Sequence, residues 1–233
     1  FLVVPAYIWH FGCGYIDMIA NVFGVAGVAF LLRGLKVDKK WNVYYLVAGI
    51  FFGVAVSSKI TLSVFAVIFL GFTGIIILQS KRDRLSQVLS NYIFPAGIGF
   101  LFFSLPYLCF HYFTTGNPFF PTLGEFFPSK YFNSMIDMQS YQSFEPVGIL
   151  EWLIFPFTLV MHTSLFGSAV EYLDGTAGVW FLLFFPFVVT AFLKSYREPT
   201  FLLVFWGSIS FIVVLALLGT WYMRYYIPSV VLL

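Results

Sequence analysis

The sequence has few charged residues and few cysteines. Only 9% of its 233 residues are Asp, Glu, Lys or Arg, and 61% are hydrophobic, whereas an ordinary soluble domain has roughly 25% charged residues. This composition excludes an ordinary soluble fold. The two cysteines, Cys13 and Cys109, are too few for a disulfide framework or a thiolate metal site. The net charge of +2 gives no indication of a nucleic acid partner.

The basic residues are unevenly distributed. Nine of the 12 Lys and Arg residues fall in three short runs, at residues 33–40, 81–84 and 194–197. Long apolar stretches separate the runs, and basic loops between membrane spans stay on the cytoplasmic side. The sequence therefore predicts a multi-pass integral membrane protein with these runs in the cytoplasm. The isolated residues Lys59, Lys130 and Arg224 then fall on the periplasmic, extracellular or lumenal side.

The apolar stretches predict an all-α bundle of transmembrane helices. A spanning helix needs about 20 mostly apolar residues, which gives about 6–8 spans or part-spans in a single membrane domain over residues 1–233. Spans are expected at residues 17–32, 43–58, 61–79, 90–112, 178–193 and 201–219, with part-spans at 1–11 and from Tyr225. Both ends of the chain fall within apolar runs, which predicts an internal fragment of a longer protein.

The sidedness of the spans constrains residues 149–166, an apolar stretch that resembles a further span. With the basic runs inside, the span 90–112 exits outward and the span 178–193 returns inward to Lys194. Residues 113–177 must then begin and end outside, and a crossing within them would put Lys194 on the wrong side. We therefore expect 113–177 to be a large outer loop in which 149–166 form an interfacial helix.

Isolated polar residues near the outer ends of the spans are the candidates for chemistry. Asp17 is either a first-turn acid favoured by the helix dipole or a catalytic or metal-binding carboxylate, and Asn21 shares its helix face. Lys59 is either a snorkelling lysine or a phosphate contact beside serine and threonine hydroxyls. Arg224 either anchors lipid head groups or clamps phosphate oxygens in a bidentate fork.

Two histidines and one turn lie at the same predicted surface. His10 and His111 either pack at the interface or approach a common cavity, and the spacing of the histidines does not match a metal-binding helix motif. The segment TTGNPFFPT at 114–122 comes directly after the span 90–112. Gly116 and Asn117 tolerate left-handed backbone, and the two prolines stiffen the rest of the segment, which predicts a fixed turn at the membrane surface.

Four segments, in this order, resemble the membrane domain of GT-C-fold glycosyltransferases, in particular the protein O-mannosyltransferase and aminoarabinose transferase superfamily. They are GYIDMIANVF around Asp17, LVAGIFFGVAVSSKIT with Lys59, TGNPFFP, and MRYYIP with Arg224. The resemblance covers essentially the whole chain. It implies an inverting enzyme that moves a sugar from a polyprenyl-phosphate donor to a protein, lipid or glycan acceptor on the outer side of the membrane.

The resemblance also implies roles for individual residues. Asp17 matches the family's second acidic position, which is associated with metal or acceptor geometry, so a divalent metal ion is a possible cofactor. Lys59 and Arg224 are similar to the cations that bind the lipid-linked phosphate. The family's principal acid lies in the first outer loop, upstream of Phe1, so we expect the chain alone to be inactive.

A transporter or lipid flippase is the alternative, because it would also combine many spans with isolated intramembrane charges. Transporters tend to place paired charges or broken helices near the bilayer midplane, often with internal symmetry. Here the candidates gather at one face, and no internal repeat is visible. A structural subunit of a membrane complex, with the outer loop docking a partner, is a third interpretation.

Overall fold

The computed structural model describes residues 16–36, 43–80, 85–120, 124, 126–130, 179–195, 197–217, 228–229 and 232. Within this part of the chain every regular element is a helix, which confirms the predicted all-α class. Three segments are long and apolar enough to cross a membrane: Ile19–Lys36, Leu62–Gln79 and Leu89–Thr115. Length and composition therefore indicate a membrane protein. The predicted interfacial helix at 149–166 lies outside the described residues.

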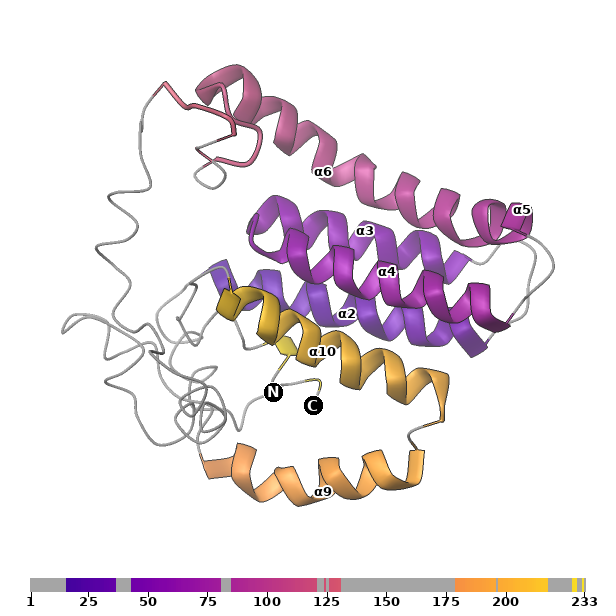
Figure 1. Ribbon diagram of the computed structural model, residues 1–233. Helices are drawn as coiled ribbons and strands as arrows, with labels where there is room; N and C mark the ends of the chain where they lie inside the picture. The colour runs from indigo at the N-terminus through magenta and orange to yellow at the C-terminus, as the bar shows by residue number, and fades with distance from the viewer. Residues whose placement is uncertain are drawn as a thin grey trace. The chain divides into compact units, whose positions relative to one another are not determined.

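The chain divides into two compact units, one of which comprises Ile19–Asp137. This α2–α6 unit contains α2 (Ile16–Lys36) from Ile19 onward, α3 (Val43–Ser58), α4 (Leu62–Ser80), α5 (Leu85–Val88), the π-helical segment η1 (Leu89–Ile93) and α6 (Phe94–Thr115). The other unit contains α9 (Val179–Ser195) and α10 (Pro199–Leu217). Each of the six complete spans expected from the sequence falls on one or more of these helices (Figure 1).

α3 and α4 confirm the predicted split of the long apolar stretch 43–79 into two helices. The backbone N–H of Leu62 donates to the carbonyl of Lys59 at 3.0 Å, which closes a tight turn after α3. The hydroxyl of Ser58 donates to the carbonyl of Val54 at 2.9 Å, one turn earlier in α3. Serine hydroxyls that bond to their own helix in this way satisfy their hydrogen-bonding needs within an apolar hairpin.

Glycines on α2 bring this helix close to α3. A Cβ atom added to Gly27 would lie 2.8 Å from the ring of Phe52, and one added to Gly34 would collide with the ring of Tyr45. Phe52 is completely buried. Gly27 faces Phe52 and the later Gly34 faces the earlier Tyr45, so the two helices are antiparallel.

α3 and α6 pack backbone against backbone. A Cβ atom added to Gly53 would lie 2.5 Å from the carbonyl oxygen of Phe100, and one added to Gly49 would lie 2.9 Å from the Phe100 nitrogen. From the other side, a Cβ atom on Gly99 would lie 2.8 Å from the nitrogen of Ile50. Small residues four apart allow transmembrane helices this close an approach. Residue numbers rise together along the two helices, so α3 and α6 are parallel.

A π-helical turn begins the long span that ends with α6. Pro95 has no backbone N–H and cannot make an ordinary helical hydrogen bond. The N–H of Phe94 bonds to the carbonyl of Leu89, five residues earlier, and this wider turn accommodates the proline. Tyr92, which is buried within η1, donates to the carbonyl of Leu70 on α4. The start of the span is thereby fixed against α4.

α9 and α10 form a helical hairpin in their own unit. The N–H of Glu198 donates to the carbonyl of Ser195 at 2.8 Å in the turn between them. Phe192 on α9 and Phe205 on α10 pack with ring centroids 4.9 Å apart. The basic run 194–197 lies at this turn, between the two spans that the sequence predicts.

Candidate functional site

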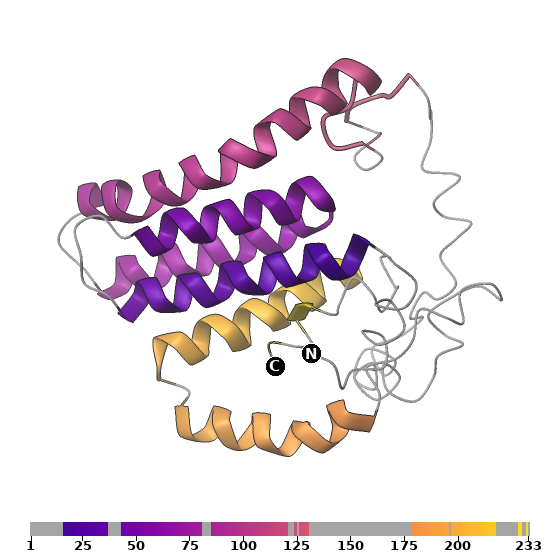
Figure 2. The same cartoon turned by 180° about the vertical axis from the view of Figure 1, so that it is seen from behind.

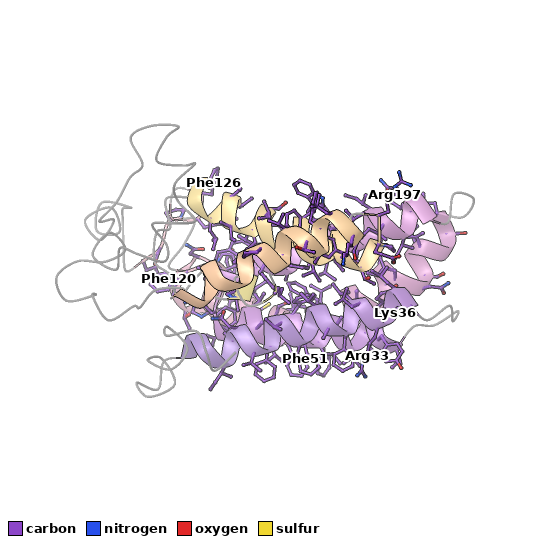
Figure 3. The ribbon with its side chains drawn as sticks, turned by 90° about the horizontal axis from the view of Figure 1, so that it is seen from below. Arg33, Lys36, Phe51, Phe120, Phe126 and Arg197 are labelled. Atoms are coloured by element: carbon purple, nitrogen blue, oxygen red, sulfur yellow. The ribbon has the colours of Figure 1, made fainter. Side chains whose placement is uncertain are left out.

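The α2–α6 unit has two chemically different ends. Arg33 and Lys36 lie in the last turn of α2, at the opposite end from Phe120 (Figure 3). Lys59, in the turn after α3, lies at the Phe120 end, because α3 runs antiparallel to α2 and parallel to α6. We call this the Lys59 end. Seen from behind, the helices run lengthwise between the two ends (Figure 2).

Asn21 is buried near the Lys59 end. Gly27 on α2 faces Phe52 on the antiparallel helix α3. Asn21, six residues before Gly27, therefore lies at the level of Ser58, six residues after Phe52 and at the end of α3. Asn21 is only 2% exposed, and its Nδ2 atom has no hydrogen-bond partner in the described part of the chain. Leaving a buried amide donor unpaired costs about 1–3 kcal/mol. This end of the unit therefore contains a buried amide donor that no described residue accepts from.

Lys59 and Asp17 occupy defined places relative to Asn21. Lys59 is partly buried, and its backbone N–H donates to the carbonyl of Ala55 at 2.8 Å. Asp17 is in the first turn of α2, one helical turn before Asn21. The structure does not describe the Asp17 side chain, so its role as a catalytic or metal-binding carboxylate stays a prediction. Among the described residues, no three His, Cys, Asp or Glu side chains form a metal-binding group.

The predicted fixed turn after α6 is confirmed for its described part. Gly116 has a φ of 86° and ends α6 in the left-handed conformation that glycine adopts most easily. Asn117 is 1% exposed, and its side-chain Oδ1 accepts the N–H of Phe119 at 2.8 Å. The N–H of Asn117 donates to the hydroxyl oxygen of Thr115 at 3.1 Å. These bonds leave the turn little freedom.

The chain then returns to the end of α6. The N–H of Lys130 donates to the carbonyl of Thr115 at 2.9 Å. The rings of Phe119 and Phe127 pack with centroids 5.6 Å apart, and Ser129 is buried. The turn is thus held between the end of α6 and the segment that closes on it.

His111 lies on α6 beneath this turn. Its ring centroid is 4.3 Å from that of Tyr107 and 6.2 Å from that of Phe120, and its Nδ1 atom has no partner among the described residues. His111 lies about 12 Å along α6 from Phe103, the residue that meets the end of α3. Its aromatic contacts fit the interpretation that it packs at the interface. The other two candidates, His10 and Arg224, lie outside the described residues.

Two features of this end were not predicted from the sequence. The hydroxyl oxygen of Ser57 lies 2.8 Å from the carbonyl oxygen of Phe103, which ties the end of α3 to the middle of α6. Tyr107 and Phe110 lie on α6 beyond this point. Tyr107 lies four residues after Phe103, and Phe110 lies three residues after Tyr107. This spacing was visible in the sequence, but the helix that α6 contacts was not.

No protein-family model, curated protein or solved structure matches this chain. Function must therefore be inferred from the Lys59 end itself. This end combines a partly buried lysine, an unpaired amide donor on Asn21 and a rigid turn. A cation with hydrogen-bond donors complements an anion such as a phosphate.

Proposed function

We propose that the protein is a membrane glycosyltransferase that moves a sugar from a polyprenyl-phosphate-linked donor to a protein, lipid or glycan acceptor. The observation that carries the proposal is that Asn21 and Lys59 gather at one end of the α2–α6 unit, away from Arg33 and Lys36. A cation and donors at one membrane surface suit the phosphate of a lipid whose chain lies in the bilayer. The four segments that resemble GT-C enzymes give independent support.

The proposal includes the architecture and sidedness that the resemblance implies. The full bundle is GT-C-like, with about 6–8 spans and an interfacial helix at 149–166. The basic runs lie in the cytoplasm, and the Lys59 end faces the periplasm, the exterior or the lumen. The location of Arg33 and Lys36 at the opposite end from Lys59 supports this orientation.

The proposed reaction is a direct displacement at the anomeric carbon. An acceptor hydroxyl oxygen attacks this carbon, the bond from the carbon to the phosphate oxygen breaks, and the configuration inverts. A second carboxylate, the family's principal acid, accepts the proton of the acceptor, and Asp17 orients the acceptor hydroxyl beside it. Lys59 and Arg224 stabilise the negative charge of the departing polyprenyl phosphate. Asn21 donates a hydrogen bond to the same phosphate.

Binding of a polyprenyl phosphate without a sugar tests the phosphate site. We expect the full-length protein in detergent to bind this lipid and Lys59→Met to weaken binding by about 10-fold to 100-fold, because a charge-assisted hydrogen bond contributes about 1.5–3 kcal/mol. Lys130→Met is the matched control, because Lys130 is an exposed lysine at the same end of the unit. Its affinity should change by less than about twofold.

Equal losses in the two variants would mean that the lipid responds only to overall charge and would contradict the site. A wild-type protein that binds no polyprenyl phosphate would contradict the proposed function itself. Incubation with a lipid-linked sugar completes the test, since a transferase releases the polyprenyl phosphate, whereas a flippase moves the lipid with its sugar attached.

A further inference from the structure

α6 extends well past the end of α3 at the Lys59 end. The Ser57 hydroxyl meets the carbonyl of Phe103 at 2.8 Å, in the last turn of α3. α6 continues from Phe103 to Thr115, which is about three turns or roughly 18 Å along its axis. Figure 1 shows α6 passing beyond the α3–α4 turn and diverging from it. Pro106 lies at the start of this stretch, and a proline within a helix is a common cause of a bend.

The face of α6 that packs on α3 continues into this extension. On the packed half, α6 meets α3 at Ala96, Gly99, Phe100 and Phe103. Side chains three or four residues apart lie on the same helix face. Continuing from Phe103 in those steps gives Tyr107, Phe110 and Thr114, which we call the α6 stripe. The α6 stripe therefore lies on the side of α6 that faces α3, beyond the level where α3 ends.

The same face changes from buried to open as it passes the end of α3. Gly99 is buried where it meets α3, whereas Phe110 is 63% exposed and Thr114 is also exposed. Tyr107 is half-buried, and its ring packs on that of His111 at 4.3 Å. His111 in turn stacks against Phe120 in the rigid turn. The first ring of the stripe is thus fixed by its neighbours, and the second is open to a ligand.

The chemistry of the stripe suits a sugar ring. A pyranose or furanose presents an apolar face of C–H groups, which packs on an aromatic ring, and an edge of hydroxyls. These hydroxyls can bond to the Tyr107 hydroxyl and donate to the Thr114 hydroxyl oxygen, whose own hydrogen is donated to the carbonyl of Phe110 at 2.7 Å. An acyl or isoprenoid chain forms no hydrogen bonds with those hydroxyls. The stripe begins about one turn beyond Phe103, the level at which α3 ends and the Lys59 turn follows. A phosphate at Lys59 and a sugar against Phe110 would match the order of groups in a lipid-linked sugar.

Resting on the function proposed above, we infer that the α6 stripe binds the sugar of the polyprenyl-phosphate donor, with Phe110 stacking against its ring. Tyr107 and Phe110 then determine which sugar is accepted, whereas Lys59 binds the phosphate common to all such donors. Removing the Phe110 ring should therefore weaken binding of sugar-bearing lipids and spare binding of the bare lipid phosphate.

The test compares two probes on the full-length protein in detergent: a polyprenyl phosphate, and the same lipid carrying a hexose or a pentose. Phe110→Ala should weaken binding of the best sugar-bearing lipid by about fivefold and leave the bare lipid phosphate within about twofold. Phe110→Trp should restore the affinity, since it retains an aromatic face. Tyr112→Ala is the matched control, because Tyr112 is an exposed aromatic residue two positions after Phe110 and so lies on another face of the helix. It should change neither affinity.

Equal weakening of both probes by Phe110→Ala would overturn the inference and identify the stripe as a contact for the lipid chain. An effect of Tyr112→Ala as large as that of Phe110→Ala would overturn it as well, because it would indicate general lipid contact. Failure of the proposed function gives a different result, since the wild-type protein would then bind neither probe.

Discussion

At the scale of single residues, Asp17 is the position whose replacement should separate chemistry from binding. We expect Asp17→Asn to reduce sugar transfer by the full-length protein by about 10²-fold, because an amide does not orient the acceptor hydroxyl beside the base as a carboxylate does. Binding of polyprenyl phosphate should stay within about twofold of the wild type. Transfer from a radiolabelled lipid-linked sugar and a binding titration measure the two quantities. Undiminished transfer would show that Asp17 is only a first-turn acid.

Replacing Asn21 should weaken binding of polyprenyl phosphate and at the same time stabilise the fold. Its Nδ2 atom is buried without a partner in the described residues, so Asn21→Leu should raise the free energy of unfolding by about 1 kcal/mol while weakening polyprenyl phosphate binding. Thr73→Val is the control, because the buried Thr73 hydroxyl donates to the carbonyl of Phe69 at 2.8 Å and its loss should give no gain. Unfolding in mixed micelles measures the free energy of unfolding of both variants. A less stable Asn21→Leu protein would mean that the amide has a structural partner.

At the scale of elements, the contact between α3 and α6 depends on the absence of side chains. A methyl group at Gly49 would collide with the backbone of Ala96 and Phe100, so Gly49→Ala should lower the free energy of unfolding by about 1–3 kcal/mol through overpacking. Gly71→Ala on α4 is the matched control, because nothing lies within 4 Å of a Cβ atom there. It should be neutral or stabilising by up to about 1 kcal/mol. A loss at Gly71 as large as the loss at Gly49 would mean that the contact with α6 does not cause the effect.

The sequence was sufficient to predict elements whose boundaries carry local signals. The hairpin split is predicted by Ser58 and Lys59 within an otherwise apolar stretch, and the turn after α6 by Gly116 and Asn117, of which Gly116 has a positive φ. α6 continues a few residues past the predicted boundary, as far as Thr115, because the apolar pattern weakens before the glycine is reached. The fixed turn was predictable because Asn117 forms its bonds within a few residues of the chain.

Contacts between distant segments were not predictable in the same way. Gly49 and Gly53 mark a small-residue face on α3, but nothing in one sequence shows that Gly99 on α6 faces it. The parallel register of these helices brings Tyr107 and Phe110 past the Lys59 turn. The α6 stripe is therefore a consequence of packing, and each of its residues taken alone resembles an ordinary lipid-facing residue.

At the scale of the whole molecule, the distribution of charge and the packing of the α2–α6 unit agree. The basic residues in the last turn of α2 lie at one end, whereas the partly buried Lys59, the buried Asn21 and the closed turn lie at the other. Antiparallel and parallel pairing fix these positions without any assumption about a membrane. The charge pattern reaches the same division from the sequence alone, so two independent arguments separate a basic end from a candidate binding end.

The sidedness of Lys130 and Glu198 provides a decisive test of this topology. If 178–193 is the only crossing between them, the two positions lie on opposite faces of the membrane. With the native cysteines of the full-length protein replaced by serine, a membrane-impermeant maleimide should label Lys130→Cys in sealed cells and label Glu198→Cys only after permeabilisation. Both positions are exposed, so access depends on the membrane and not on burial. Labelling of both in sealed cells would mean that 149–166 also crosses, because two crossings return the chain to the same face.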